Sequence, residues 1–184
     1  MPDGSSKVIA ARLLAILLIS AGCLSATQIT FTTSLVTPGA PGTAIWEYDY
    51  TLTGFSFVTN EDLQILFDPT LFGTLQNGIA MPAGDWDLQT FQPDPGLPDN
   101  GVYDLLALVD HPSFTGPFSI QFTLLGDVPP VSQSWKVVQL DSNFAPGPVL
   151  DSGTANSSDL PEPAAAWLGI AGLSVLVARR LKIL

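Results

Sequence analysis

Apolar and polar residues alternate with a period of two over several short stretches in the middle of the chain. In the stretch 44–53, Trp46, Tyr48 and Tyr50 occupy alternate positions, and Glu47 and Asp49 lie between them. This period is that of a β-strand, in which successive side chains point to opposite faces. The same pattern predicts further strands at 28–36, 62–67, 85–91, 102–109, 117–126 and 134–140.

Turn residues separate these stretches, and no amphipathic helix of useful length lies between them. The chain has 184 residues, of which 16 are Gly and 16 are Pro. This composition favours many short elements joined by turns over long helices. We therefore predict an all-β fold, an antiparallel β-sandwich of about seven to nine strands.

Residues 1–26 have the layout of a secretory signal peptide. Lys7 and Arg12 precede an apolar run at 13–26, and small residues lie near its end. This order of a basic region, an apolar region and a cleavage region predicts an N-terminal signal helix that is removed on export, with a retained membrane anchor as the alternative. Cys23, the only cysteine, falls inside this segment. The mature body would then carry no disulfide and no thiolate.

A second apolar segment lies at the other end of the chain. Residues 164–178 contain no charge, and as a helix they would be roughly 22 Å long. That length is marginal for spanning a bilayer, so we predict a transmembrane-type helix that crosses the membrane transiently. A basic cluster follows it and should stay on the cytoplasmic side. The members of this cluster are Arg179, Arg180 and Lys182.

A short Pro-Glu-Pro motif, formed by Pro161, Glu162 and Pro163, precedes the apolar segment. Its two prolines favour an extended peptide, a shape that proteases bind. The order of motif, apolar helix and basic cluster resembles the PEP-CTERM sorting signal of exported proteins in Gram-negative bacteria. In that family a membrane-embedded protease, the exosortase, is thought to cut near the motif, and the freed protein goes to the cell surface or the extracellular matrix. A plain C-terminal anchor is the alternative.

The resemblance implies partners and a location. The partners would be the export machinery and an exosortase-like protease, and the protein would reside in the inner membrane transiently before it moves to the surface or outside the cell. Within the body, the stretch 103–122 resembles a segment that recurs in bodies attached to PEP-CTERM tails. The stretch 65–75 resembles the strand and turn of cohesin-like sandwiches. Neither similarity implies an activity.

The segment between the body and the tail, residues 146–160, becomes rich in Ser, Gly, Asn and Asp. Such a composition is typical of a flexible linker. The predicted organisation is therefore a signal peptide at 1–26, a β-sandwich body at 27–145, a polar linker at 146–160 and a sorting tail at 161–184.

The body is strongly acidic. Between residues 27 and 160, 15 Asp and Glu stand against the single basic residue Lys136, a net charge of −14. Such a surface repels phosphate backbones, which argues against a nucleic-acid partner. Four oxygen-bearing residues fall close together in sequence and are a candidate Ca²⁺ site, although the same residue types are also ordinary turn formers. They are Asp94, Asp99, Asn100 and Asp104.

Signals for catalysis are few. His111 is the only histidine, and neighbouring residues on a strand face opposite ways, so Asp110 beside it does not form a relay by adjacency. Asp85 and Asp87 share a strand face and are a candidate carboxylate pair for glycoside hydrolysis, but a solvated strand face opposite Trp86 and Leu88 is the favoured interpretation. We therefore expect no enzyme and no cofactor, with Ca²⁺ as the one candidate ion.

The aromatic row of Trp46, Tyr48 and Tyr50 has two interpretations. Same-face alternation predicts core positions, whereas aromatic rings exposed on a β-sandwich can stack on sugars. We predict a secreted, non-enzymatic structural or adhesive component of an exopolysaccharide or biofilm matrix. A carbohydrate-binding module is the first alternative, with extracellular polysaccharide as its partner. A calcium-dependent adhesin is the second.

Overall fold

The computed structural model describes residues 27–97 and 99–158. The expected signal helix at 1–26, the motif at 161–163, the helix at 164–178 and the basic cluster all lie outside these residues. No helix of the described part of the chain is long and apolar enough to cross a membrane. The described residues form nine strands: β1 Gln28–Thr37, β2 Ile45–Thr53, β3 Glu61–Phe67, β4 Phe72–Ala80, β5 Trp86–Phe91, β6 Gly101–Ala107, β7 Phe118–Leu124, β8 Ser132–Leu140 and β9 Pro146–Ser157.

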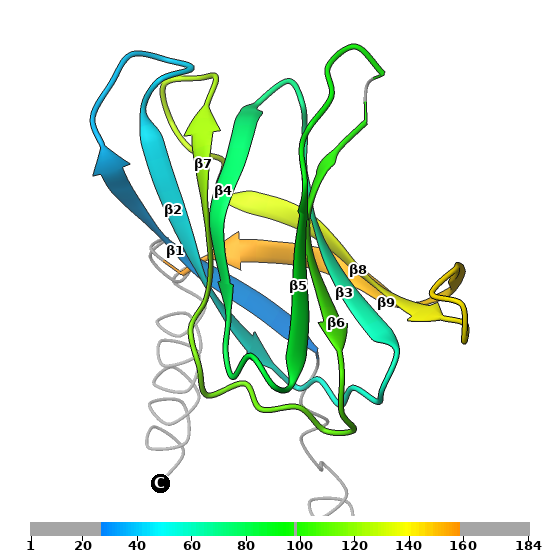
Figure 1. Cartoon of the computed structure of the whole chain (residues 1–184). Coiled ribbons are helices and arrows are strands. Elements are labelled where there is room, and N and C mark those ends of the chain that lie inside the picture. The colour runs from blue at the N-terminus through cyan, green and yellow to red at the C-terminus, as the bar shows by residue number, and fades with distance from the viewer. Residues whose placement is uncertain (1–26, 98, 159–184) are drawn as a thin grey trace, which may run out of the picture.

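The nine strands belong to one sheet with the order β4-β7-β2-β1-β9-β8-β3-β6-β5 (Figure 1). Neighbouring strands run antiparallel except β1 and β9, which are parallel. The all-β prediction is confirmed. The prediction of a purely antiparallel fold is wrong at this one pair, because the last strand enters the sheet beside the first in the same direction.

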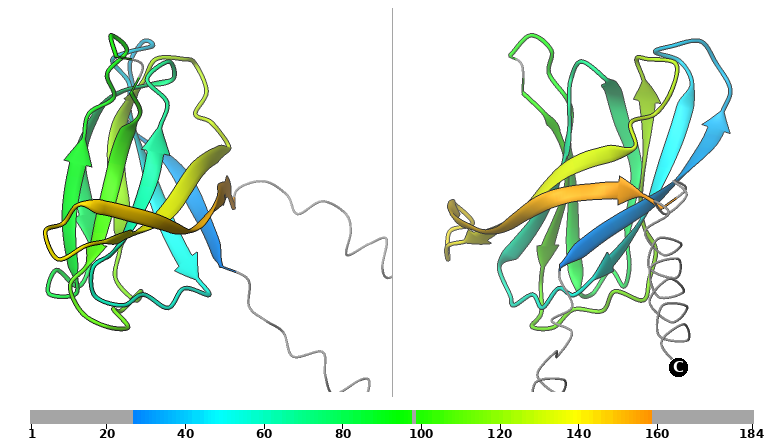
Figure 2. Two further views of the ribbon diagram at one scale, coloured as in Figure 1. Left: turned by 90° about the vertical axis from the view of Figure 1, so that its right-hand side faces the viewer. Right: turned by 180° about the vertical axis from the view of Figure 1, so that it is seen from behind.

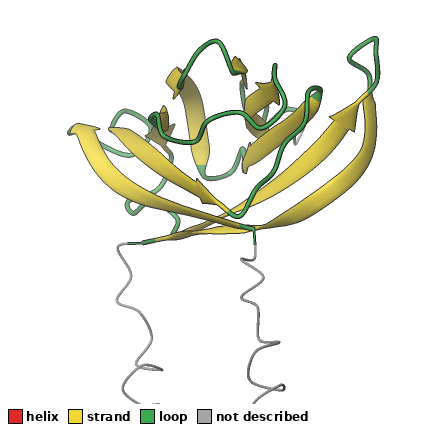
Figure 3. Ribbon diagram, turned by 90° about the horizontal axis from the view of Figure 1, so that it is seen from below, coloured by secondary structure: helices red, strands yellow, loops and turns green. Residues whose placement is uncertain are grey.

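The sheet curves until its two edge strands, β4 and β5, contact each other. Figure 3 shows this curvature from below. Gln92, which follows β5, completes the join through both ends of its amide. Its Oε1 accepts a hydrogen bond from the Leu75 N–H at 2.9 Å, and its Nε2 donates to the Leu75 carbonyl at 2.8 Å. The result is a nearly closed, sandwich-like barrel whose edges are covered, an arrangement that protects edge strands from pairing with other chains.

Aromatic side chains fill the interior. The ring centroid of Tyr48 lies 4.4 Å from that of Phe31 and 4.5 Å from that of Phe122. The Tyr48 ring also lies near the rings of Phe67 and Phe72. Burying the Tyr48 ring leaves its hydroxyl in need of a partner, and the hydroxyl donates to the Pro130 carbonyl at 2.8 Å. One ring at the centre of the core therefore ties strands from both halves of the sheet together.

The aromatic row of β2 is part of this core. Tyr48 and Tyr50 are buried, and the Tyr50 hydroxyl donates to Gln133 Oε1. Trp46 is half-buried and packs against the same cluster. This burial agrees with the core interpretation and removes Tyr48 and Tyr50 as candidates for sugar stacking, because neither ring has a face free for a ligand.

The expectation of a polar linker at 146–160 is wrong for the described part of that segment. Residues 146–157 form β9, which pairs with β8 along most of its length and with β1 at its end. Nearly all of its side chains are exposed, and Ala155 is fully buried. The strand is held by backbone hydrogen bonds more than by an apolar face, which is why its composition looks like that of a linker.

The pairing of β9 with β8 gives a direct test. Gly153 lies opposite Trp135, and a Cβ atom added there would come within 2.7 Å of the Trp135 ring. Because Trp135 is a buried ring with little room to move, Gly153→Ala should destabilise the protein by about 1–3 kcal/mol in urea unfolding. Gly126→Ala is the control, since nothing lies within 4 Å of its added Cβ. Equal stability of the two variants would contradict the role of β9.

Candidate functional site

One hollow is a groove of about 490 Å³ on the outer face of β3, β6 and β5. Three further hollows are smaller and measure about 280, 160 and 140 Å³. Ligand-binding clefts usually have a volume of about 300–1,000 Å³, which makes this groove the best candidate site. Its polar lining consists of Asp62, Gln64, Asp87, Gln89 and Asp104. Its apolar lining consists of Phe91, Val102, Leu106, Leu140, Phe144 and Pro146.

Strand alternation places the polar side chains of the groove on one surface. In β3, Leu63 and Ile65 are fully buried in the core, so Asp62 and Gln64 face outward. The register then aligns two rows across the strands. Gln64, Asp104 and Gln89 form one row, and Asp62, Leu106 and Asp87 form the next. Asp104 therefore lies beside two amides and diagonal to two carboxylates, within reach of their side chains.

The hairpin between β8 and β9 forms one wall of the groove. In the left view of Figure 2 it passes in front of the green strands β5 and β6. Asp141 shapes its tip, because Oδ1 accepts hydrogen bonds from the N–H groups of Asn143 and Ala145. Phe144 takes a left-handed φ of 61°, which is uncommon for a large residue, and is 63% exposed. The tip thus presents an aromatic ring at the groove rather than burying it.

Asp62 lies between β6 and β8 and is shielded from water. Although this residue faces outward, only 2% of its surface is exposed. Its Oδ2 accepts a hydrogen bond from Gln64 Nε2 at 2.6 Å, whereas Oδ1 receives none from a fixed donor of the described residues. A buried carboxylate oxygen without a donor is costly, so a donor is expected at this position.

Asp104 is the nearest group that can supply a proton. Burial, a hydrogen bond to the Asp62 carboxyl and the negative charges of Asp62 and Asp87 raise the pKa of Asp104 to about 8, while Lys136 opposes the shift. Two carboxyl groups form a hydrogen bond only when they share a proton. The groove therefore holds a carboxyl–carboxylate pair at neutral pH, with Asp87 exposed beside it.

The candidate calcium residues are not brought together. Asp94 and Asp99 form a backbone bridge in the β5–β6 loop, and Asp94 Oδ1 accepts from the Gly96 N–H at 2.8 Å, as in an ordinary turn. Asp104 lies in β6, four residues beyond Asn100, or about 13 Å along an extended chain. One ion cannot contact the side chains of both Asn100 and Asp104 across that distance. Within residues 27–97 and 99–158, no group of three or more His, Cys, Asp or Glu is spaced to hold a metal ion.

Asp85 and Asp87 do not act as a pair either. The carboxylate of Asp85 accepts a hydrogen bond from the Ser113 N–H at 2.8 Å and so holds the loop after β6, whereas Asp87 lines the groove.

His111 and Asp110 do not form a relay with each other. The Nδ1 atom of His111 lies 3.3 Å from Ser56 Oγ, and the Asp110 carboxylate accepts hydrogen bonds from Thr59. Asp85, Asp110 and His111 each have a structural partner and do not line the groove, whereas Asp87 does.

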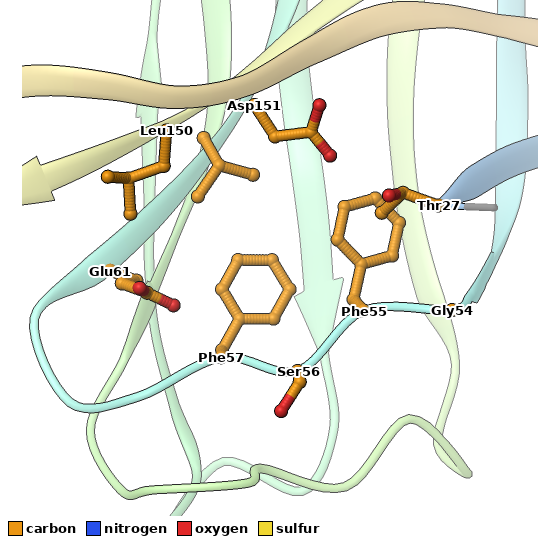
Figure 4. Close-up of a pocket in the computed structure, with 9 residues that line it drawn as sticks. Thr27, Gly54, Phe55, Ser56, Phe57, Glu61, Leu150 and Asp151 are labelled. Atoms are coloured by element: carbon orange, nitrogen blue, oxygen red, sulfur yellow. The ribbon is translucent and has the colours of Figure 1, made fainter. Parts of the chain in front are cut away.

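A second, smaller hollow lies near the start of β1, between the chain before β3 and β9 (Figure 4). Phe55 and Phe57 line it with their rings stacked at 5.3 Å, and Glu61 and Asp151 add two carboxylates. Its volume of about 160 Å³ is close to that of a single small molecule such as benzene. This volume lies below the usual range of ligand-binding clefts, so the groove on β3, β6 and β5 is the better candidate.

The sequence does not reveal the groove, although each of its members is visible there. Asp62 stands at an outward position of a predicted strand, but β3 pairs with β6 and not with a strand next to it in the chain. Asp104 follows the loop residues Asp94, Asp99 and Asn100 in the sequence, so the sequence alone associates it with them and not with Asp62. An acidic residue at an outward position on each of several strands is the signal that could have pointed to the site.

Comparison with known proteins adds little. No family model and no curated protein matches the sequence. Among solved structures, the chain is similar to a cohesin module from a Clostridium perfringens ATCC13124 family 33 glycoside hydrolase, with a TM-score of 0.35 and 8% identity. The match covers 71% of this chain and 100% of that one. A likeness at this level carries no argument about the chain's function.

The pKa of Asp104 predicts how stability depends on pH. Its folded value of about 8 exceeds the unfolded value of about 3.9, so the folded state holds more protons between these limits. Stability from this group is therefore full at low pH and falls as pH rises from about 4 to about 8. The slope cannot exceed about 1.4 kcal/mol per pH unit, because only one proton is involved. Partial solvation of Asp104 lowers the total change in stability.

Asp104→Asn should remove this component. Urea titrations give the free energy of unfolding of the wild type and of the variant at each pH. The wild-type value minus the variant value should decrease as the pH is raised from about 5 to about 8. Asp127→Asn, at an exposed position outside the groove, is the charge-matched control. A difference that is flat with pH would show that the two carboxyls do not share a proton.

Proposed function

We propose that the protein is an exported, surface-sorted and non-enzymatic module that binds an extracellular polysaccharide through the groove on β3, β6 and β5. The groove itself carries the proposal. It is large enough for sugar rings, and its floor combines carboxylates and amides with apolar side chains. Hydroxyl-rich ligands bind through this combination, because polar groups fix their orientation and apolar surfaces cover their ring faces.

Two exposed aromatic residues suit a sugar ligand. Phe91 is 48% exposed at the end of β5, and Phe144 is 63% exposed on the hairpin. Both line the groove, and they come from different elements. Exposed aromatic side chains gain little by staying in water, so a ligand that covers them is stabilised by apolar burial. They replace the β2 row as the candidates for sugar stacking.

The groove also lies far from the C-terminal exit of the body. Pro146, at the start of β9, lines the groove, whereas Ser157, at its end, pairs with Phe31 of β1. The 12 residues of β9 separate these two points by about 35–40 Å. A chain attached to a membrane or a cell surface through the residues after Ser157 would keep the groove free for a ligand.

The carboxyl pair supports binding rather than glycoside hydrolysis. Glycosidases hold their two carboxyls about 5–5.5 Å apart or about 6.5–9.5 Å apart, so that a sugar or a water fits between them. Asp62 and Asp104 share a hydrogen bond, which leaves no such space. The matrix role and the surface location rest on the end segments, whose order resembles the PEP-CTERM signal.

Removal of the groove aromatics should weaken polysaccharide binding. Surface polysaccharide purified from the producing bacterium should retard the protein in affinity gels, and Phe91→Ala or Phe144→Ala should weaken this binding about 5-fold, the equivalent of about 1 kcal/mol. Both residues are exposed, so unfolding should change by less than about 0.5 kcal/mol. Val128→Ala, at an exposed apolar position outside the groove, is the control. Equal retardation of all variants would argue against the groove.

The sorting proposal predicts a mature chain without either end segment. Intact-mass measurements on native protein from membrane, surface and medium fractions should find the leader absent and the chain cut close to Pro163. Replacing Arg179, Arg180 and Lys182 together should leave the protein in the membrane fraction, because the basic cluster fixes the orientation of the helix. A surface form that still ends at Leu184 would contradict sorting by cleavage.

A further inference from the structure

We infer that the groove selects polysaccharides whose sugars carry free, protonated amino groups over neutral or acidic ones. This inference rests on the proposed function and names the ligand class for the same site. Two observations carry it: the groove contains an excess of hydrogen-bond acceptors, and one of these acceptors is buried without a fixed donor.

The excess of acceptors arises because the side-chain amides of Gln64 and Gln89 direct their donors toward carboxylates of the groove. Gln64 Nε2 donates to Asp62 Oδ2 at 2.6 Å, and Gln89 Nε2 lies 3.5 Å from Asp87 Oδ2. One donor of each amide is thus turned toward a carboxylate of the groove. Carboxylates only accept when ionised, and the amide oxygens of the two glutamines also accept. A ligand that satisfies this surface has to bring donors.

The buried oxygen of Asp62 makes the need specific. Asp62 is 2% exposed and lines the groove, and apart from the proton that it shares with Asp104 it has no donor at Oδ1. A protonated amine carries three donors and a positive charge, so it can contact the Asp62–Asp104 pair and the exposed Asp87 together. A sugar hydroxyl supplies one donor without charge and leaves the single negative charge of the pair uncompensated.

The charge around the groove favours the same ligand. Lys136 is the only basic residue between positions 27 and 160, where 15 acidic residues stand. It already acts on Asp104, whose pKa it lowers against the other influences. The remaining field attracts cations and repels carboxylates. A polysaccharide of uronic acids should therefore be excluded, and one with amino groups should be concentrated near the protein.

The experiment compares four six-unit probes by calorimetry with the mature protein. They are oligomers of glucosamine, N-acetylglucosamine, galacturonic acid and lysine, tested at about pH 6, where amines are charged, and in about 0.3 M NaCl, where long-range attraction is screened. The glucosamine oligomer should bind about 10-fold or more tightly than its acetylated form, since a charged hydrogen bond is lost on acetylation. The galacturonic acid oligomer should not bind.

Variants locate the effect. Asp62→Asn should bring the preference for glucosamine over N-acetylglucosamine close to 1, and Asp87→Asn should reduce it even if Asp62→Asn fails to fold. Asp127→Asn removes the same charge outside the groove and should leave the preference unchanged. A preference that survives both groove variants, or that Asp127→Asn lowers equally, would overturn the inference.

Three further outcomes separate the inference from the function on which it rests. Equal binding of the glucosamine oligomer and the N-acetylglucosamine oligomer would overturn the selection for amines and leave polysaccharide binding intact. Binding of the lysine oligomer as tightly as glucosamine would overturn a sugar ligand in favour of a general cation site. If no sugar oligomer binds and the purified surface polysaccharide does not bind either, the proposed function itself fails.

Discussion

The insertion of β9 between β1 and β8 is the constraint on which the rest of the structure depends. Without it the sheet would consist of two halves, β4-β7-β2-β1 and β8-β3-β6-β5, joined only at β4 and β5. Backbone pairing with both neighbours closes the gap, and small side chains let the strand lie close, as Gly153 does over the ring of Trp135. The same strand begins at the hairpin that walls the groove. The closure of the fold and the shape of the candidate site therefore share one element.

The floor of the groove has an electrostatic peculiarity. Asp62 is buried near Asp104, and burial of one carboxylate beside another is unfavourable unless a proton or a cation lies between them. The protein retains this arrangement on an outer face, where a serine or threonine would cost less. Residues that reduce stability without improving packing are most often kept for a function. The raised pKa of Asp104 and the candidate binding groove therefore depend on the same two carboxyl groups.

Much of the sheet could be predicted from the sequence, and the reasons for the failures are physical. The alternation through Tyr48 and Tyr50 placed β2 and its inward face correctly. β4 was missed because two irregularities in its pairing with β7 break the period of two. β9 was missed because its side chains are mostly exposed and its Pro and Gly resemble a linker. The groove was missed because strand order, which places Asp62 beside Asp104, is a property of the whole fold.

The most direct test of the central claim, that the groove is the binding site, is to map ¹⁵N amide shifts while surface polysaccharide is added to the protein. The account predicts that shifts gather on the outward positions of β3, β5 and β6 and on the hairpin tip at 141–146. Shifts that gather instead around the half-buried Trp46 and the loop after β1, or that spread evenly over the acidic surface, would contradict it.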